Sequence, residues 1–205
     1  MRATVIVLSK VPGAAPVKTR LVPALGEAGA RALFVEMMRA TLDLARRFDP
    51  LPTVAFSPPD ADPARGLPGL GPCRFEPTRG ADGARCLEDA LQRAFRGTPL
   101  VALGGDAPDL PVERVEAALA ALSHRGAALV PTGDGGFSCL ALARPVPGLA
   151  AGFRYGAADA FSSLTAFLAD RGLRPITLES WPDVDTPEDL EAWRRRARRQ
   201  LVRDR

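Results

Sequence analysis

The stretch "TPLVALGGDAPDL", residues 98–110, joins a short apolar run to a loop that carries two carboxylates. The apolar part, residues 98–105, predicts a strand buried in a sheet. Asp106 and Asp109 follow within a few residues of its end. Negative charges at this point serve either a ligand or the start of the next helix. The architecture around the strand decides between the two.

Apolar runs and amphipathic segments alternate along the chain on both sides of this stretch. Strands are predicted at residues 3–9, 51–58, 73–77, 98–105, 127–132, 136–143 and 173–179. Helices are predicted at residues 27–48, 86–95, 111–126, 158–172 and 186–201. Residues 58–72 are too rich in proline and glycine to assign. Such alternation predicts a single α/β domain over residues 1–205, a Rossmann-like, mainly parallel sheet with helices on both faces.

The composition is that of an ordinary globular chain of 205 residues, 46% hydrophobic and 25% charged. It has no apolar run of about 18 residues, so we expect no membrane span. The first residues predict a strand and not a signal peptide. Three cysteines without metal-like spacing, Cys73, Cys86 and Cys139, are expected to be reduced, structural thiols. A cytoplasmic protein is the expectation.

The positive charge is concentrated at the C-terminus. Formal net charge is +3, and residues 194–205 hold seven arginines and one aspartate, which is +6 and leaves −3 for the rest. A basic end of this kind is typical of a solvated helical tail, where arginine opposes the helix dipole. No RNA-binding signature accompanies it, so no nucleic-acid partner is expected.

The architecture gives the two carboxylates different roles. In open α/β sheets, ligands bind beyond the carboxyl ends of the strands, which is where Asp106 is placed. Mg²⁺ in proteins prefers one or two carboxylates together with phosphate oxygens. We therefore expect Asp106 to hold a metal ion or act on a phosphate. Asp109 is expected to cap the helix that begins near Pro111.

A loop rich in small residues and cations, "KVPGAAPVKTRL" (10–21), follows the first predicted strand. Gly13 and the alanines let a ligand approach the backbone, and Lys10, Lys18 and Arg20 place positive charge near the same sheet edge. Both properties suit the phosphates of a nucleotide. Neither the GxxxxGK[ST] nor the GxGxxG phosphate-binding pattern is present.

Two later stretches also carry carboxylates. In "VPTGDGGFSCLAL" (130–142), Asp134, Gly135 and Gly136 form either a hairpin turn or a substrate pocket with Asp134 as hydroxyl acceptor or general base. In "WPDVDTPEDL" (181–190), Asp183 or Asp185 could complete a metal site with Asp106. The alternative for the second stretch is helix capping, for which Thr186 and Asp189 have capping-box spacing.

In their order along the chain, these four stretches resemble the GT-A-fold glycosyltransferase family once catalogued as domain of unknown function 2064 (radical-SAM/selenodomain-associated transferases). The resemblance spans nearly the whole chain. The framework is also similar to that of 2-phospholactate guanylyltransferase and molybdenum-cofactor guanylyltransferase. It implies a nucleotide-diphospho-sugar transferase-like fold and a Mg²⁺ or Mn²⁺ cofactor.

The resemblance also implies roles for individual residues. The metal ligands would be Asp106, Asp185 and Asp183. From the chemistry of the transfer, we expect Lys18 and Arg20 to stabilise the leaving group and Asp134 to act as general base. Nucleotide, phosphate and pocket contacts would come from Lys10, Gly13, Lys18, Arg20, Arg85, Gly135 and Gly136. The chain departs from the family's pattern at Gly105, at Gly133, within residues 79–90, and in lacking a tryptophan near residues 153–160.

The function that follows is a metal-dependent transferase with a nucleotide-activated donor. A GT-A glycosyltransferase would move a sugar from a nucleotide sugar to a small acceptor. A nucleotidyltransferase would take a nucleoside triphosphate and release pyrophosphate. A third hypothesis is a non-catalytic nucleotide-binding protein. The sequence leaves the acceptor and the oligomeric state open.

Overall fold

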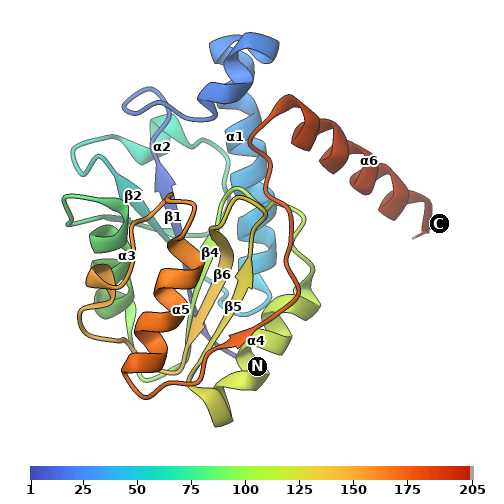
Figure 1. Cartoon of the computed structure of the whole chain (residues 1–205). Helices are drawn as coiled ribbons and strands as arrows, with labels where there is room; N and C mark the ends of the chain where they lie inside the picture. The colour runs from blue at the N-terminus through green and yellow to red at the C-terminus, as the bar shows by residue number, and fades with distance from the viewer. Residues whose placement is uncertain (204–205) are drawn as a thin grey trace.

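One seven-stranded sheet, in the order β3-β2-β1-β4-β6-β5-β7, forms the centre of the molecule (Figure 1). The computed structural model describes the backbone of residues 1–203 and the side chains of residues 1–199. The strands are β1 (Thr4–Lys10), β2 (Thr53–Ser57), β3 (Arg74–Pro77), β4 (Leu100–Gly104), β5 (Ala127–Pro131), β6 (Phe137–Leu142) and β7 (Ile176–Thr177). Only β6 runs antiparallel to its neighbours, β4 and β5; all other pairs are parallel. The mainly parallel sheet predicted from the sequence is confirmed.

Helices cover both faces of the sheet (Figure 1). The longer ones are α1 (Val22–Arg46), α3 (Gly83–Ala94), α4 (Val112–Arg125), α5 (Ala160–Asp170) and α6 (Pro187–Arg203). Short helical segments are η1 (Thr19–Leu21), α2 (Pro63–Gly66) and η2 (Leu149–Ala151). Helices α1 and α4 pack on one face, and α3 and α5 on the other. Within residues 1–203, no helix combines the length and the apolar character needed to cross a bilayer.

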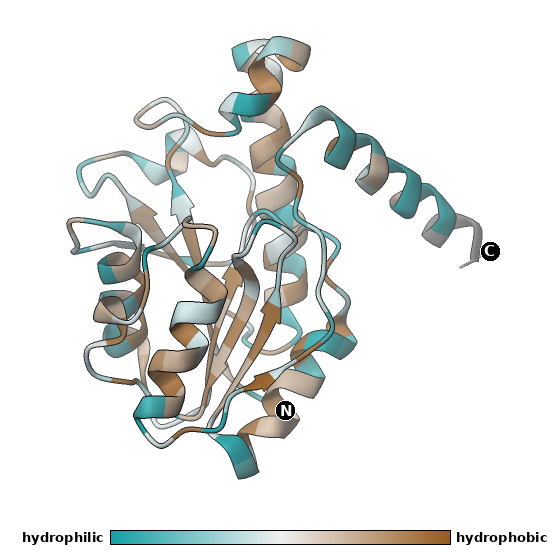
Figure 2. Cartoon of the chain, in the orientation of Figure 1, coloured by the Kyte–Doolittle hydropathy of each residue, from teal (hydrophilic) through white to brown (hydrophobic). Residues whose placement is uncertain are grey.

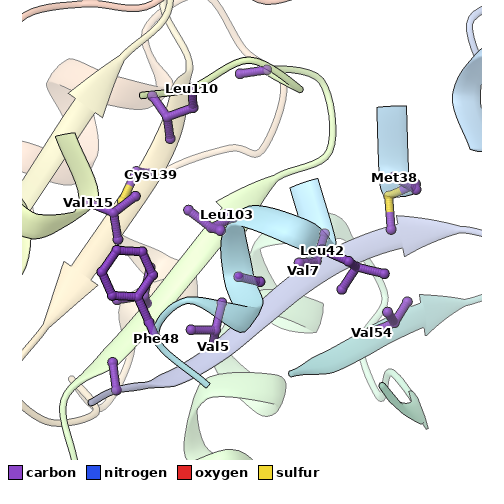
Figure 3. Packing of buried hydrophobic residues seen from close by; sticks show 14 of the residues in the cluster. Val5, Val7, Met38, Leu42, Phe48, Val54, Leu103, Leu110, Val115 and Cys139 are labelled. Carbon is purple, nitrogen blue, oxygen red and sulfur yellow. The ribbon is translucent and has the colours of Figure 1, made fainter. Parts of the chain in front are cut away.

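Side chains of successive strand residues point to opposite faces, which gives the sheet two separate cores. Val5 and Val7 of β1 join the core under α1 and α4, where Met38, Leu42 and Val115 pack against them (Figure 3). Ile6, between the two valines, joins the core under α3 and α5. Strands buried on both faces read as continuous apolar runs, as β1 and β4 do in the sequence.

Several elements differ in extent from their predicted ranges. The first helix begins at Val22 instead of residue 27, and Gly26 interrupts it with a positive φ of 69°. Residues 58–72 contain the single turn α2, whose first amides bond to the Asp62 side chain. The last strand shrinks to Ile176–Thr177, since Pro175 before it has no N–H for the ladder.

The three cysteines lie apart from one another, and the C-terminal helix ends the described part of the chain. Cys73, Cys86 and Cys139 are free thiols. Burial raises the pKa of Cys139 to about 12, so this thiol stays protonated. Helix α6 extends away from the sheet with a largely hydrophilic surface (Figure 2). It accounts for residues 194–203 of the predicted tail, and residues 204–205 lie outside the described part.

Candidate functional site

A cavity of about 1100 Å³ lies beyond the carboxyl ends of β1, β2, β3 and β4. This is the sheet edge at which the sequence places a ligand. Its walls come from the loop after β1 with Lys10 and Lys18, from the loops after β2 and β3, and from Asp106 after β4. Tyr155 and Asp185 complete the lining from the C-terminal half of the chain. The cavity therefore gathers segments from both halves of the chain.

Lys18 lies at the centre of a network of ion pairs in this cavity. Its Nζ is 2.5 Å from Oδ1 of Asp106 and 2.7 Å from Oδ1 of Asp185, and it donates to the Val184 carbonyl at 2.7 Å. Only 3% of the Lys18 side chain is exposed, compared with 54% for Asp106 and 33% for Asp185. The ammonium is thus buried beneath two carboxylates that are in contact with solvent.

The backbone of Lys18 is unusual as well. It lies in the left-handed region with φ 46°, the only non-glycine residue of the described chain with positive φ. Non-glycine residues in this region are uncommon, and such strain concentrates at functional sites. The left-handed turn starts η1, directly after the loop that carries Gly13.

The charge of Lys18 is fixed by its two partners. Burial pushes the pKa of its ammonium down, but the nearby carboxylates of Asp106 and Asp185 push it up and prevail, so that the pKa lies above its ordinary value. Lys18 is therefore a permanent cation. Its three N–H donors are taken by Asp106, Asp185 and the Val184 carbonyl, so it can act on an anionic ligand through its charge and not through a direct hydrogen bond.

Asp185 of this network also belongs to a cluster of three carboxylates. Oxygens of Asp134, Asp183 and Asp185 lie within 4.8 Å of one another. Asp134 sits in the β5–β6 hairpin loop and accepts hydrogen bonds from Oγ1 of Thr132 at 2.5 Å and from the Gly136 amide at 3.0 Å. The hairpin interpretation of this stretch is confirmed.

The carboxylates of this cluster repel one another. Burial, together with the charges of Asp134, Asp185 and Asp189, raises the pKa of Asp183 to about 6. Three carboxylates offer the hard oxygen ligands that Mg²⁺ and Mn²⁺ prefer, so the residues present fit such an ion. The expected metal ligands Asp183 and Asp185 are in this cluster. Asp134 joins them, whereas Asp106 pairs with Lys18.

The other predicted residues lie at varying distances from the cavity. Arg20 is 70% exposed, with its Nη1 3.7 Å from Oδ2 of Asp185. Lys10 lines the cavity, and no described residue forms an ion pair with it. Gly13, Arg85 and Gly136 do not line it. Gly13 borders two neighbouring hollows instead, and Arg85 pairs with Asp82 at the start of α3.

Gly135 packs closely against the start of α5. Its φ is +89°, and a Cβ built on it would lie 1.8 Å from the carbonyl oxygen of Ala158. The Gly135 carbonyl also accepts a hydrogen bond from the Phe161 amide at 2.8 Å. The glycine thus lets the hairpin loop dock against the start of α5.

The prediction that Asp109 caps α4 is wrong. The cap position of α4 is Pro111, and no side chain bonds to the first amides of this helix. Asp109 instead accepts hydrogen bonds from Trp181 Nε1 at 3.1 Å and from Arg196 Nε at 2.7 Å. By contrast, the predicted capping box of α6 forms: the side chains of Thr186 and Asp189 bond each other's backbone amides.

Sequence reasoning missed Tyr155 as a wall of the cavity. The residue is 49% exposed, and its ring lies against Gly83 and meets Phe137 and Phe153 edge-on or tilted. A solitary tyrosine in a glycine-rich loop gives no periodic signal. One further signal was readable: Lys10 and Lys18 are the chain's only lysines among 27 lysines and arginines.

Comparisons with known proteins agree with this geometry. A family model described as "Uncharacterized protein conserved in bacteria (DUF2064)" matches residues 41–157. The crystal structure of a candidate nucleotide-diphospho-sugar transferase from Desulfovibrio desulfuricans G20 is 32% identical with a TM-score of 0.81, covering 93% of this chain and 85% of that one. None of the curated proteins matches the chain.

More distant solved structures share the fold alone. CMP:2-keto-3-deoxy-manno-octonic acid synthetase in complex with CTP is 16% identical with a TM-score of 0.62, covering 98% of this chain and all of that one. The Mycobacterium tuberculosis H37Rv protein Rv0371c, solved in complex with manganese, is 18% identical with a TM-score of 0.57, covering 94% and 97%. The nucleotide-diphospho-sugar transferase fold predicted from the sequence is confirmed.

Proposed function

The chain belongs to the family described as "Uncharacterized protein conserved in bacteria (DUF2064)", and from this premise we propose that it is a metal-dependent transferase with a nucleotide-activated donor. The donor we favour is a nucleotide sugar, from which the protein would move the sugar to a small acceptor. The observation that carries the proposal is the buried Lys18 cation between Asp106 and Asp185 in the wall of a 1100 Å³ cavity. The Desulfovibrio relative supports the donor class.

In this proposal each part of the site has a chemical task. The diphosphate of the donor lies along the loop after β1, where Lys10, Lys18 and Arg20 provide positive charge. As the bond to the leaving group breaks, negative charge accumulates on that diphosphate. Lys18 is fixed in place beforehand by two carboxylates and the Val184 carbonyl, so its positive charge would act on the diphosphate from a fixed position, without a direct hydrogen bond.

Asp134, Asp183 and Asp185 would hold the divalent ion, Mg²⁺ or Mn²⁺. When bound, such an ion neutralises charge on the phosphate oxygens of the leaving group. This placement favours a cation-binding role for Asp134 over the role of general base. Asp106 keeps Lys18 oriented toward the cavity, and Tyr155 offers a ring against which a nucleoside or sugar can pack.

A second candidate is nucleotidyl transfer, in which an acceptor attacks the α-phosphorus of a nucleoside triphosphate. The similarity in fold to a CTP-bound synthetase over the whole of both chains favours it. This reaction relies chiefly on positioning and on neutralising phosphate charge, which Lys18 and Arg20 can supply.

A thermal-shift screen tests both candidates. Nucleoside diphosphates, nucleoside triphosphates and nucleotide sugars are added with and without Mn²⁺. A ligand at about 100 times its dissociation constant adds about 2.7 kcal/mol of stability. Mn²⁺-dependent stabilisation by a nucleotide sugar, followed by release of a nucleoside diphosphate, supports glycosyl transfer.

Other outcomes separate the alternatives. Stabilisation by a triphosphate with release of pyrophosphate would move the assignment to nucleotidyl transfer. Binding without turnover of any donor would favour a non-catalytic nucleotide-binding protein. The absence of any shift would contradict the nucleotide site itself.

A further inference from the structure

The side chains of Asp109, Trp181 and Arg196 form a cluster outside the cavity, which we call the Asp109 clamp. Arg196 donates through Nε to Oδ2 of Asp109 at 2.7 Å and through Nη2 to Oδ1 at 3.3 Å, and Trp181 Nε1 donates to Oδ1 at 3.1 Å. The guanidinium also lies 5.8 Å from the centre of the Trp181 ring. Asp109 is 14% exposed and Arg196 29%. A forked, largely buried contact of this kind fixes orientation as well as distance.

The clamp joins three segments that are distant in the sequence. Asp109 lies in the loop after β4, three residues beyond Asp106. Trp181 lies in the connection between β7 and α6, two residues before Asp183. Arg196 lies on α6, the helix that otherwise extends away from the sheet (Figure 1). The Asp109 carboxylate therefore links the loop that carries Asp106 to the connection that carries Asp183 and Asp185, and links both to α6.

The connection from β7 to α6 has no regular structure of its own. Residues 178–186 have neither a strand nor a helix until Pro187. Three backbone bonds place it: the Leu178 amide donates to the Leu129 carbonyl at 2.9 Å, the Trp181 amide to the Pro131 carbonyl at 3.0 Å, and the Val184 amide to the Asp106 carbonyl at 2.8 Å. The buried side chain of Val184 and the Lys18 bond to its carbonyl hold the end of the connection near α6, and the Asp109 clamp holds its middle through Trp181.

We propose that the Asp109 clamp is a positioning device that holds Asp183 and Asp185 beside Asp134 and against Lys18, and thereby sets the affinity of the site for its divalent cation. The inference rests on the proposed function for its cation and on the observed contacts for its geometry. Its members are positioning residues, because none of them lines the cavity.

Hydrogen exchange tests the geometry directly. In Arg196→Met, we expect the Val184 amide to exchange about 10-fold faster or more than in the unaltered protein, because the local opening that exposes it becomes easier. The matched control is Arg195→Met, which removes the neighbouring arginine on α6, 62% exposed and 3.5 Å from Glu191. This control should leave the exchange unchanged. Equal exchange in the two variants would overturn the proposal.

Measurement of Mn²⁺ affinity tests whether the clamp affects cation binding. The electron-paramagnetic-resonance signal of the free ion reports how much Mn²⁺ remains unbound. Loss of a group that orients metal ligands typically lowers affinity about 10- to 100-fold, and we expect this range for Arg196→Met. Arg196→Lys, which keeps the charge without the fork, should be intermediate, and Arg195→Met unchanged. Trp181→Phe removes the N–H together with the five-membered ring of the indole, keeps an aromatic side chain, and serves if Arg196→Met fails to fold.

The two measurements together separate this inference from the proposed function. If the unaltered protein binds no Mn²⁺, the metal in the proposed function is wrong, and the exchange result alone upholds or overturns the positioning of the two carboxylates. If it binds Mn²⁺ and Arg196→Met binds it equally well, the clamp has only a structural role and the inference fails.

Discussion

Lys18 and Asp106 meet at 2.5 Å between Nζ and Oδ1, with the ammonium buried and the carboxylate half exposed. The contact joins the loop after β1 to the loop after β4, two strands that lie side by side in the sheet. Because Asp185 binds the same ammonium at 2.7 Å, one lysine ties together both halves of the chain. The ion pairs of Lys18 therefore link the two sides of the cavity.

Replacing this lysine should therefore cost stability. In Lys18→Met the two carboxylates keep their places but lose their shared cation, and we expect the free energy of unfolding to fall by about 1–3 kcal/mol. The exposure of both carboxylates keeps the cost below that of breaking a fully buried pair. Chemical denaturation measures it. Lys10→Met, which alters the other lysine of the cavity, should stay within about 0.5 kcal/mol of the unaltered protein. Equal losses in the two variants would contradict a special role for Lys18.

The two lysines should also differ in reactivity. An amine-reactive ester should acylate the exposed Lys10 readily and leave Lys18 unmodified, because Lys18 is 3% exposed and its carboxylate partners raise the pKa of its ammonium. Peptide mass spectrometry locates the acyl groups. Rapid acylation of Lys18 in the folded protein would mean that the ion pairs with Asp106 and Asp185 do not persist in solution. Unfolding in urea, which should make the two lysines equally reactive, is the control.

The sequence placed the main parts of the site at the correct sheet edge, but it could not pair them. Asp106 was predictable because it ends a buried strand, where ligands of α/β sheets bind. The ion pairs of Lys18 with Asp106 and Asp185 were not predictable. They depend on a left-handed backbone at Lys18 and on the path of the β7–α6 connection, whose sequence has no periodic pattern. The prediction that Asp109 caps α4 was wrong for a related reason. Capping rules consider only neighbours in the sequence, whereas the partners of Asp109 are the distant Trp181 and Arg196.

The acidic cluster should make stability depend on pH in a particular direction. Burial and the charges of Asp134, Asp185 and Asp189 raise the pKa of Asp183 from 3.8 to about 6 in the folded protein. The folded state therefore holds its proton more tightly than the unfolded state. Stability from this group is present below about pH 4 and is lost as the pH rises through about 6.

Asp183→Asn should remove this loss. In metal-free buffer, thermal unfolding of the variant and of the unaltered protein should coincide near pH 4, and the variant should be the more stable near pH 8. Added Mn²⁺ should reverse the order near pH 8 if the carboxylate binds the ion. A variant that is less stable near pH 8 without metal would contradict the repulsion inferred for the cluster.

The paired glycines of the hairpin loop provide a sharp test of its docking. In Gly135→Ala the new methyl group would lie 1.8 Å from the Ala158 carbonyl oxygen, at a φ of +89° that alanine disfavours. The positive φ alone costs about 1–3 kcal/mol, and the clash adds to it, so we expect a loss of more than about 3 kcal/mol in denaturant unfolding. Gly133→Ala is the control two positions earlier, since a methyl group placed there would meet no atom within 4 Å. This variant should stay within about 0.5 kcal/mol of the unaltered protein. If Gly135→Ala were equally mild, the loop would not be held against α5, and the position of Asp134 beside Asp183 would lose its structural basis.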